Sequence, residues 1–435
     1  MNTHLEFVIE KERQHVSWRR TCLNMVASEN VASPSVRKRL SSDFQNRYVN
    51  IYGPTLSSGW KAYNEKRWYE GLDYIEEVER RCVRLLQELF HATYADYRPL
   101  SGNVANLDCF VSLTKIGDII FTKSTEHGGH GEGWDDAAVL LGRRIERYPF
   151  NEKDFVIDVD KASRKIKEIR PRLIVLGASQ ILFPEPVEEL KKAADEVGAA
   201  IDFDGSHVLG LIAGHRFQDP LEEGATVLSA STHKTFPGPQ GGVLLSNASE
   251  EITSVLDVNL DPSLIDNYHQ NRMAALTVAS AEMIEFGNDY ALQVLSNAKA
   301  LAQALHEEGF NVLCEHRGFT ESHQVLVNVT AHGLTGTEAA KLLAKNNLIV
   351  SACSLPGDAQ KGIKSGIRFG TSETTRVGMK PSDMNYAAEL FRRALIDKDR
   401  ADSVRADVKE FTKRFQKIYY SFDEGKIAYE VEQQG

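Results

Sequence analysis

The segment AIDFDGSHVLGLIAG (residues 200–214) decides the fold, because its short apolar run ends directly in a polar turn. Four similar runs lie nearby, at residues 118–121, 173–176, 226–228 and 242–245. Helical patterns separate the runs, for example over residues 186–197, where apolar residues keep a helical period. This alternation predicts a mostly parallel sheet covered by helices on both faces.

The rest of the chain predicts helices and a second, smaller domain. An amphipathic helix is expected over residues 4–20, and a long helix over 269–309. The C-terminal part mixes a strand with helices, and these are expected at 324–329, 338–345, 381–396 and 401–417. We therefore expect a helical arm (1–22), a large α/β domain (23–290) and a smaller α+β domain (291–435).

Composition narrows the class of protein. A length of 435 residues suits two domains, and the net charge of −10 disfavours nucleic acid and anionic membranes as main partners. No apolar run approaches the ~20 residues that a membrane span needs, and the N-terminus has no signal-peptide pattern. The five cysteines are scattered and lack metal-ligand spacing, which favours reduced thiols, a cytoplasmic location and no metal.

Two motifs suggest a phosphate-bearing ring as ligand. Ser101, Gly102 and Asn103 precede a helical run, and a helix start of small residues suits a phosphate. The same residues are also typical of an ordinary helix N-cap. Asp204 follows a strand, at the edge where functional groups of open α/β sheets collect. Its carboxylate can hold a pyridine nitrogen protonated, or it can cap the next element.

Two further motifs bring a nucleophile and a carboxylate receptor. Lys234 lies in SASTHKTFPGPQGG (229–242), between hydroxyl groups and a Pro/Gly-rich turn. A lysine forms Schiff bases when its surroundings lower its pKa, whereas most lysines are solvated surface charges. Arg368 lies in the apolar run GIRFGT (366–371), where its guanidinium can grip a carboxylate or form a structural salt bridge.

Taken together, the motifs resemble the serine hydroxymethyltransferase family of fold-type-I enzymes that depend on pyridoxal 5'-phosphate (PLP). The strings that carry the resemblance follow the family's order: NMVASEN (24–30), PLSG (99–102), EHGGHG (126–131), DGSH (204–207), STHKT (231–235) and GIRFGT (366–371). The likeness is greatest to the archaeal branch, through GSHVLGLIAG (205–214) and YSFDEG (420–425). It implies an aspartate aminotransferase-like α/β fold with a smaller C-terminal domain.

The resemblance also implies a role for each matching residue. Lys234 matches the Schiff-base lysine, Asp204 the partner of the pyridine nitrogen, and Arg368 and Ser28 the groups that hold the substrate carboxylate. Tyr48 and Tyr69 match tyrosines that the family supplies from the neighbouring subunit of a homodimer. The remaining matches are to cofactor-binding residues, of which the histidines also act in catalysis: Ser101, Gly102, Asn103, His130, Ser179, His207, Ser231 and His233.

The departures from the family are concentrated around tetrahydrofolate. Asn50 replaces a glutamate that moves a proton, Cys353 replaces an asparagine of the folate pocket, and Gly131 replaces a leucine of the folate channel. The segment 51–65, which contains Trp60, is longer than usual. The phosphate-binding glycine-rich loop reads DPSLI (261–265) here, while the other PLP residues are retained.

These features predict a PLP enzyme that acts at the α-carbon of a β-hydroxy amino acid or glycine. The preferred reaction is folate-independent aldol cleavage or transfer to an aldehyde, as in threonine transaldolases. Folate-dependent serine or α-methylserine hydroxymethyl transfer is the first alternative. A specialised-metabolism lyase that works by β-elimination or decarboxylation is the second, and a non-catalytic binding protein on the same fold is the third.

Overall fold

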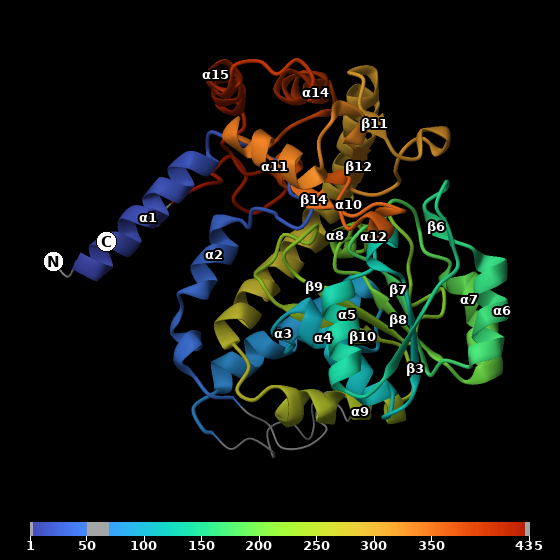
Figure 1. Cartoon of the computed structure of the whole chain (residues 1–435). Coiled ribbons are helices and arrows are strands. Elements are labelled where there is room, and N and C mark those ends of the chain that lie inside the picture. Colours follow the sequence, from blue (N-terminus) through green and yellow to red (C-terminus); the bar gives the residue numbers. More distant parts are fainter. Residues whose placement is uncertain (1–2, 50–68, 431–435) are drawn as a thin grey trace. The chain divides into compact units, whose positions relative to one another are not determined.

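A computed structural model describes residues 3–49 and 69–430 of the chain (Figure 1). Contacts divide it into two compact units, each described here by itself. The large unit runs from Ser35 to Ala291, and the small unit combines the residues up to Pro34 with those from Leu292 onward. The division after Ala291 lies within the long helix α10 (Gln270–Glu307). A separate arm of residues 1–22 stays a prediction.

The large unit is built on a mixed sheet that has seven strands within the described residues. Strand β10 is antiparallel to both of its neighbours, whereas the remaining neighbours pair in parallel. The mostly parallel α/β sheet expected from the sequence is therefore confirmed. In spatial order the strands are β2 (Tyr94–Asp96), β10 (Gly242–Ser246), β9 (Val227–Ser231), β8 (Ala200–Asp204), β7 (Leu173–Gly177), β3 (Ile119–Thr122) and β4 (Arg144–Arg147).

Helices flank this sheet on its two sides. Figure 1 shows α6 and α7 packed together on one side, with α4 on the other. Outside α10, the helices and turns of the large unit are α2 (Pro34–Leu40), η1 (Asp43–Asn46), α3 (Asp73–Phe90), α4 (Gly102–Leu113), η3 (Thr125–His127), α5 (Gly131–Leu140), α6 (Val159–Ile169), α7 (Val187–Val197), α8 (Leu209–Ala213), α9 (Glu250–Val258) and η4 (Asn259–Leu264). Strands β5 (Phe150–Asn151) and β6 (Val156–Ile157) form a separate hairpin.

The central strands form because their side chains are buried on both faces. Every residue of β7 and of β9 is buried, as expected for parallel strands between two helical layers. Strand β9 extends to Ser231, three residues beyond the apolar run, because the hydroxyl groups of Ser229 and Ser231 find partners inside the protein. The edge strand β4 reads RIER and has no apolar run, so hydrophobic periodicity does not reveal it.

The small unit is an α+β structure with its own core. Its sheet has the order β11-β12-β15-β14, and β1 pairs in parallel with β13. Buried residues such as Met25, Phe369 and Phe391 form one apolar cluster. Apart from α10, its elements are α1 (Thr3–Arg19), β1 (Leu23–Asn24), β11 (Asn311–Val312), η5 (Glu315–Arg317), β12 (Gln324–Asn328), η6 (Thr330–His332), α11 (Gly336–Lys345), β13 (Leu348–Ile349), β14 (Ser351–Cys353), α12 (Asp358–Lys361), β15 (Gly366–Gly370), α13 (Ser372–Arg376), α14 (Pro381–Leu395) and α15 (Ala401–Thr412).

Two expectations about the helices need correction. Helix α15 ends at Thr412 rather than at residue 417, because the chain turns there and Lys417 forms a β-bridge with Ile427. Helix α1 forms where expected, but it is not amphipathic: its apolar residues do not gather on one face, none is buried in the single chain, and Phe7 is 62% exposed. Among the described helices, none is long and apolar enough to cross a membrane.

Candidate active site

The sequence-predicted residues of the large unit gather where three parallel strands end. Strands β7, β8 and β9 end at Gly177, Asp204 and Ser231, and their register places Gly177 and Ser229 beside Asp204. A Cβ atom on Gly177 would stand 2.1 Å from the Asp204 carbonyl oxygen, so only glycine allows this approach. The carboxyl edge of the sheet is the usual ligand-binding edge of open α/β folds.

Helix α4 begins at this edge and offers free backbone donors. The Ser101 hydroxyl oxygen caps the helix by accepting a hydrogen bond from the Val104 N–H at 3.1 Å. The backbone N–H groups of Gly102 and Asn103 make no hydrogen bond within the described part of the chain. A helix start with free N–H groups and a positive dipole end suits a phosphate.

Ser206 connects this helix start to the strands, a role that the sequence analysis did not assign. Its hydroxyl oxygen accepts a hydrogen bond from the Ser231 N–H at 3.0 Å, and its own N–H donates to Asp204 Oδ1 at 3.0 Å. A Cβ atom on Gly102 would stand 2.3 Å from the Ser231 hydroxyl oxygen. Helix start, β8 and β9 are therefore held together at van der Waals distance.

The Asp204 carboxyl group is positioned by these contacts. The residue is only 5% exposed, and Oδ1 is occupied by the Ser206 N–H. Within the described residues Oδ2 makes no hydrogen bond, which leaves one acceptor for a ring N–H. This is the arrangement that a partner of a protonated pyridine nitrogen requires.

His130 lies at the N-terminus of α5, next to the phosphate loop. Its Nδ1 is 3.2 Å from the Ser179 hydroxyl oxygen. Gly133 lies between two predicted site residues, because a Cβ atom there would be 2.1 Å from His130 Cδ2 and 2.5 Å from Asn103 Oδ1. The structure thus brings His130, Ser179 and Asn103 together, as the sequence analysis expected.

The loop that carries Lys234 is tied to the end of β8. The Thr235 hydroxyl group donates to the His207 carbonyl oxygen at 2.8 Å, and His207 is only 3% exposed. Lys234 itself is half-buried. Burial, and secondarily the Lys234 charge, lower the pKa of His233 to about 4, so this imidazole is neutral at pH 7.

Tyr48 and Tyr69 contact each other, with their ring centroids 5.5 Å apart. Both rings are solvent-exposed in the single chain, at 52% and 41%. The residues between them are not all described: Asn50 and the long segment 51–65 with Trp60 lie outside the described residues. The structure therefore gives no account of the departure at Asn50.

The predicted carboxylate-binding residues belong to the small unit. Arg368 lies on β15, and burial lowers the pKa of its guanidinium from the ordinary value. The end of β15 adjoins the segment before Ser28, because the Gly370 N–H donates to the Met25 carbonyl oxygen at 2.9 Å. The grip of Arg368 and Ser28 on a substrate carboxylate stays a prediction.

Two of the departures from the family lie at closely packed positions. Cys353 lies across from Gly366 in the register of β14 and β15, and burial raises the pKa of its thiol to about 12, so it is neutral. Gly131 packs against Thr125, since a Cβ atom would stand 2.0 Å from the Thr125 hydroxyl oxygen. A leucine at position 131 would require the Thr125 hydroxyl group to move.

The segment that replaces the glycine-rich loop carries a buried acid. Asp261 lies in η4, and its Oδ2 is 3.3 Å from Arg98 Nη1. Arg98 also pairs with Asp96 and Asp257, so the Asp261 carboxylate belongs to a buried ionic cluster. A carboxylate that is engaged in this way cannot replace backbone N–H donors to a phosphate.

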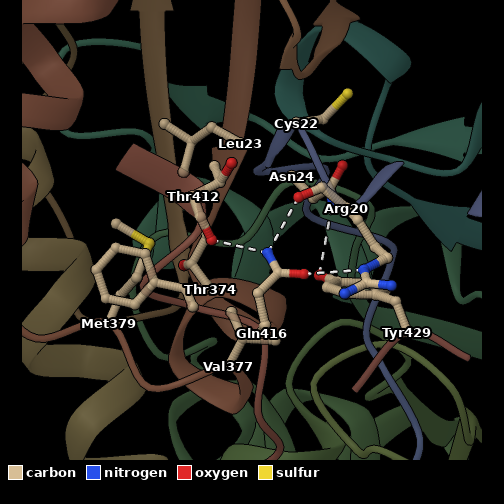
Figure 2. A pocket seen from close by; sticks show the side chains of 11 residues that line it. Arg20, Cys22, Leu23, Asn24, Thr374, Val377, Met379, Thr412, Gln416 and Tyr429 are labelled. Carbon is tan, nitrogen blue, oxygen red and sulfur yellow. Dashed lines mark hydrogen bonds between the residues drawn. The ribbon is translucent and has the colours of Figure 1, made fainter. Parts of the chain in front are cut away.

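A small pocket in the small unit lies apart from the predicted residues (Figure 2). Figure 2 shows that Gln416 fills its polar side: its Nε2 donates to the Arg20 and Thr412 carbonyl oxygens at 3.0 and 2.7 Å. Arg20 Nε donates back to Gln416 Oε1 at 3.1 Å. These groups fasten the C-terminal segment to the N-terminal strand and leave little for a ligand.

The residues of the large unit fit PLP. Free N–H groups at the start of α4 suit its phosphate, and the open acceptor of Asp204 suits its pyridine nitrogen. Lys234 lies on a loop that is bound to the adjoining strand end. The fit rests on these contacts within one unit.

Comparison with known proteins shows which family this chain resembles. A family model described as serine hydroxymethyltransferase matches residues 2–391. The serine hydroxymethyltransferase of Methanocaldococcus jannaschii is 46% identical over 419 residues, covering 95% of this chain and 94% of the relative. That of Methanopyrus kandleri is 45% identical over 426 residues, covering 97% and 96%.

A solved structure agrees with these relatives. The crystal structure of an L-threonine transaldolase from Pseudomonas fluorescens superposes with a TM-score of 0.87 and 28% identity, covering 99% of this chain and 94% of that one. The fold-type-I architecture inferred from the motifs is confirmed. This chain belongs to the serine hydroxymethyltransferase family of PLP-dependent transferases.

Proposed function

We propose that this enzyme cleaves or forms the bond between the α- and β-carbons of a β-hydroxy amino acid without tetrahydrofolate. An aldehyde is the second substrate or product, and glycine is the amino acid that remains. The observation that carries the proposal is the uneven pattern of change. Apart from the glycine-rich loop, which reads DPSLI (261–265), the PLP residues are retained and fit the cofactor, whereas three positions of the folate site have changed to Asn50, Cys353 and Gly131.

The cofactor is held by groups at the carboxyl edge of the sheet. Lys234 forms the covalent link, and the N–H groups of Gly102 and Asn103 bind the phosphate. When bound, PLP supplies an electron-withdrawing ring that stabilises negative charge at the amino acid's α-carbon. Asp204 would keep a proton on the pyridine nitrogen through Oδ2, since Oδ1 is occupied by the Ser206 N–H.

The substrate is oriented by groups around that ring. Arg368 binds the α-carboxylate in bidentate fashion, assisted by Ser28. Burial lowers the pKa of its guanidinium. By their match to the family, His130 and His207 would contact the cofactor ring. The neutral imidazole of His233 is available as a proton acceptor near Lys234.

The neighbouring subunit completes the site in this proposal. Tyr48 and Tyr69 present exposed rings in the single chain, which suits a contribution across a homodimer interface. Large exposed aromatic rings are stabilised when a partner covers them. All five cysteines are buried and free, which supports a reducing compartment such as the cytoplasm.

Cys353 separates this reaction from the folate-dependent one. In the family, this position supplies an amide to the pterin ring, and a thiol is a much weaker hydrogen-bonding partner. Here the Sγ atom packs toward Gly366, at 2.8 Å from the position of an added Cβ atom. The structural similarity to an L-threonine transaldolase supports aldol chemistry on this fold.

Folate-dependent serine hydroxymethyl transfer is the second candidate. The specific observation in its favour is the name of the relatives that are 45 to 46% identical over nearly the whole chain. The two candidates make different demands, since the folate reaction needs an acid or base where Asn50 stands.

Product analysis tests the proposal. Purified enzyme is incubated with L-serine, L-threonine or glycine, each with and without an added aldehyde, and the amino acids are identified by mass spectrometry. We expect a new β-hydroxy amino acid whenever an aldehyde is supplied, and no product from Lys234→Ala. Formation of pyruvate, an amine or no product at all would contradict aldol chemistry.

A further inference from the structure

Asp202 is a buried acid that the family comparison and the proposed reaction leave without a role. It lies on β8, two residues before Asp204, and none of its surface is exposed. Because side chains alternate along a strand, both carboxyl groups point to the same face of the sheet, roughly 7 Å apart along the chain. Asp202 therefore lies on the same face of β8 as Asp204, one step farther from the carboxyl edge of the sheet.

Among the described residues, no cation acts on Asp202 at close range. Its register partners are Val175 on β7 and Val227 on β9. From α4, Asn106 and Cys109 approach it. Asn106 is already engaged, since its Nδ2 donates to the Ser229 hydroxyl oxygen at 2.8 Å and its Oδ1 accepts from Trp134 Nε1 at 3.3 Å.

Neither carboxyl oxygen of Asp202 has a hydrogen-bond partner of good geometry in the part of the chain that the structure describes. Burial first, and the Asp204 charge second, raise the pKa of Asp202 to about 7, while Ser229, Cys109 and Asn106 moderate this shift. The other titratable group that faces it is Cys109, and burial raises the pKa of this thiol far enough to keep it neutral. Asp202 thus changes charge near neutral pH, next to the proposed cofactor partner.

We propose that Asp202 is a positioning residue which, through Asp204, strengthens the hold on the protonated pyridine nitrogen as the pH rises. This inference rests on the proposed function of Asp204. Below neutral pH Asp202 carries a proton and contributes no charge. Above it, a second carboxylate adds to that of Asp204 and stabilises the cationic ring nitrogen, at the pH where the ring would otherwise lose its proton.

The dissociation constant of PLP, measured at two pH values, tests the coupling. Wild type and Asp202→Asn are compared at pH 6 and pH 8.5. At pH 6 the two should bind PLP alike, because asparagine resembles the neutral acid in shape and charge. At pH 8.5 wild type should bind PLP about tenfold more tightly than Asp202→Asn does. This is the effect expected of a carboxylate roughly 9 Å from the cationic ring nitrogen in a medium of intermediate dielectric constant. If the ratio of the two dissociation constants, variant to wild type, is the same at both pH values, the proposal is wrong.

Asp108→Asn is the matched control. Asp108 is a buried acid on α4 whose pKa burial also raises, but it contacts Ser112 and faces the Arg98 cluster. Its substitution should leave the pH dependence of PLP binding unchanged. If Asp202→Asn fails to fold, Asp202→Ser takes its place in the same comparison. If wild type binds no PLP at either pH, the proposed function fails, whereas bound PLP with a constant ratio rejects the role of Asp202 alone.

Discussion

Replacing Asp202 by asparagine should change the difference in stability between variant and wild type with pH. This difference should move in favour of the variant as the pH rises. A buried acid with a raised pKa binds its proton more tightly in the folded state than in the unfolded state. Its contribution to the free energy of unfolding is therefore most favourable at low pH and is lost as the pH rises through the folded pKa. Asparagine does not titrate, so the variant escapes this loss.

The size of the effect follows from the burial of Asp202. A pKa of about 7, against about 3.9 for an exposed aspartate, corresponds to a total of about 4 kcal/mol. About two-thirds of this develops between roughly pH 5 and 8.5. For a chain of 435 residues, with about 2 cal/mol/K of unfolding entropy per residue, the difference in Tm between variant and wild type should change by about 3 °C.

The assay is thermal unfolding of both proteins in their PLP-free form at several pH values, because bound PLP would add its own pH-dependent stabilisation. Only the difference between them reports on Asp202, because Glu223 and Glu373 also have raised pKa values of about 7 and titrate in both proteins. If the difference in Tm between variant and wild type stays constant with pH, or if the variant becomes relatively less stable at high pH, Asp202 is not a buried carboxyl group with a raised pKa.

Three further predictions concern the site itself. Arg368→Lys should weaken amino-acid binding about ten- to a hundredfold while PLP binding is unchanged, because a point charge cannot replace a bidentate fork; equal binding in a spectroscopic titration would make Arg368 structural. Gly102→Ala should lower PLP affinity at least about tenfold, because the new Cβ atom would stand 2.3 Å from the Ser231 hydroxyl oxygen; unchanged affinity would remove the helix start from the phosphate site. Mixed dimers of Lys234→Ala and Tyr48→Phe chains should recover part of the activity that each parent lacks, and no recovery in verified heterodimers would argue against shared sites.

The fold was predictable where burial dictates the sequence. Strands β7 and β8 lie between helices on both faces, so they appear as apolar runs, and α7 and α10 keep a clear helical period. The edge strand β4 could not be found this way, because its RIER sequence is half solvated. Helix α15 ended early for a tertiary reason, the bridge at Lys417, which no local pattern encodes.

The site was predictable as a set of residues but not as a set of contacts. The motifs identified Asp204 and Ser231, but not the role of Ser206, whose N–H donates to Asp204 and whose hydroxyl oxygen accepts from Ser231. Asp202 went unnoticed because it sits inside an otherwise apolar run, although its spacing of two from Asp204 places both on one face. Gly133 gave no signal at all, since its importance comes from the approach of His130 to its backbone.

The most direct test of the account is the rate of serine-to-glycine conversion and of threonine cleavage with and without tetrahydrofolate. Wild type is compared with a variant that carries Asn50→Glu and Cys353→Asn, which restores the acid and the amide of the folate site. We expect wild-type rates that do not depend on tetrahydrofolate, and a response to it only in the variant, since a positioned acid or base is worth ~10²–10⁴-fold in rate. Rapid conversion of serine by wild type only when tetrahydrofolate is present, with no gain in the variant, would contradict the account.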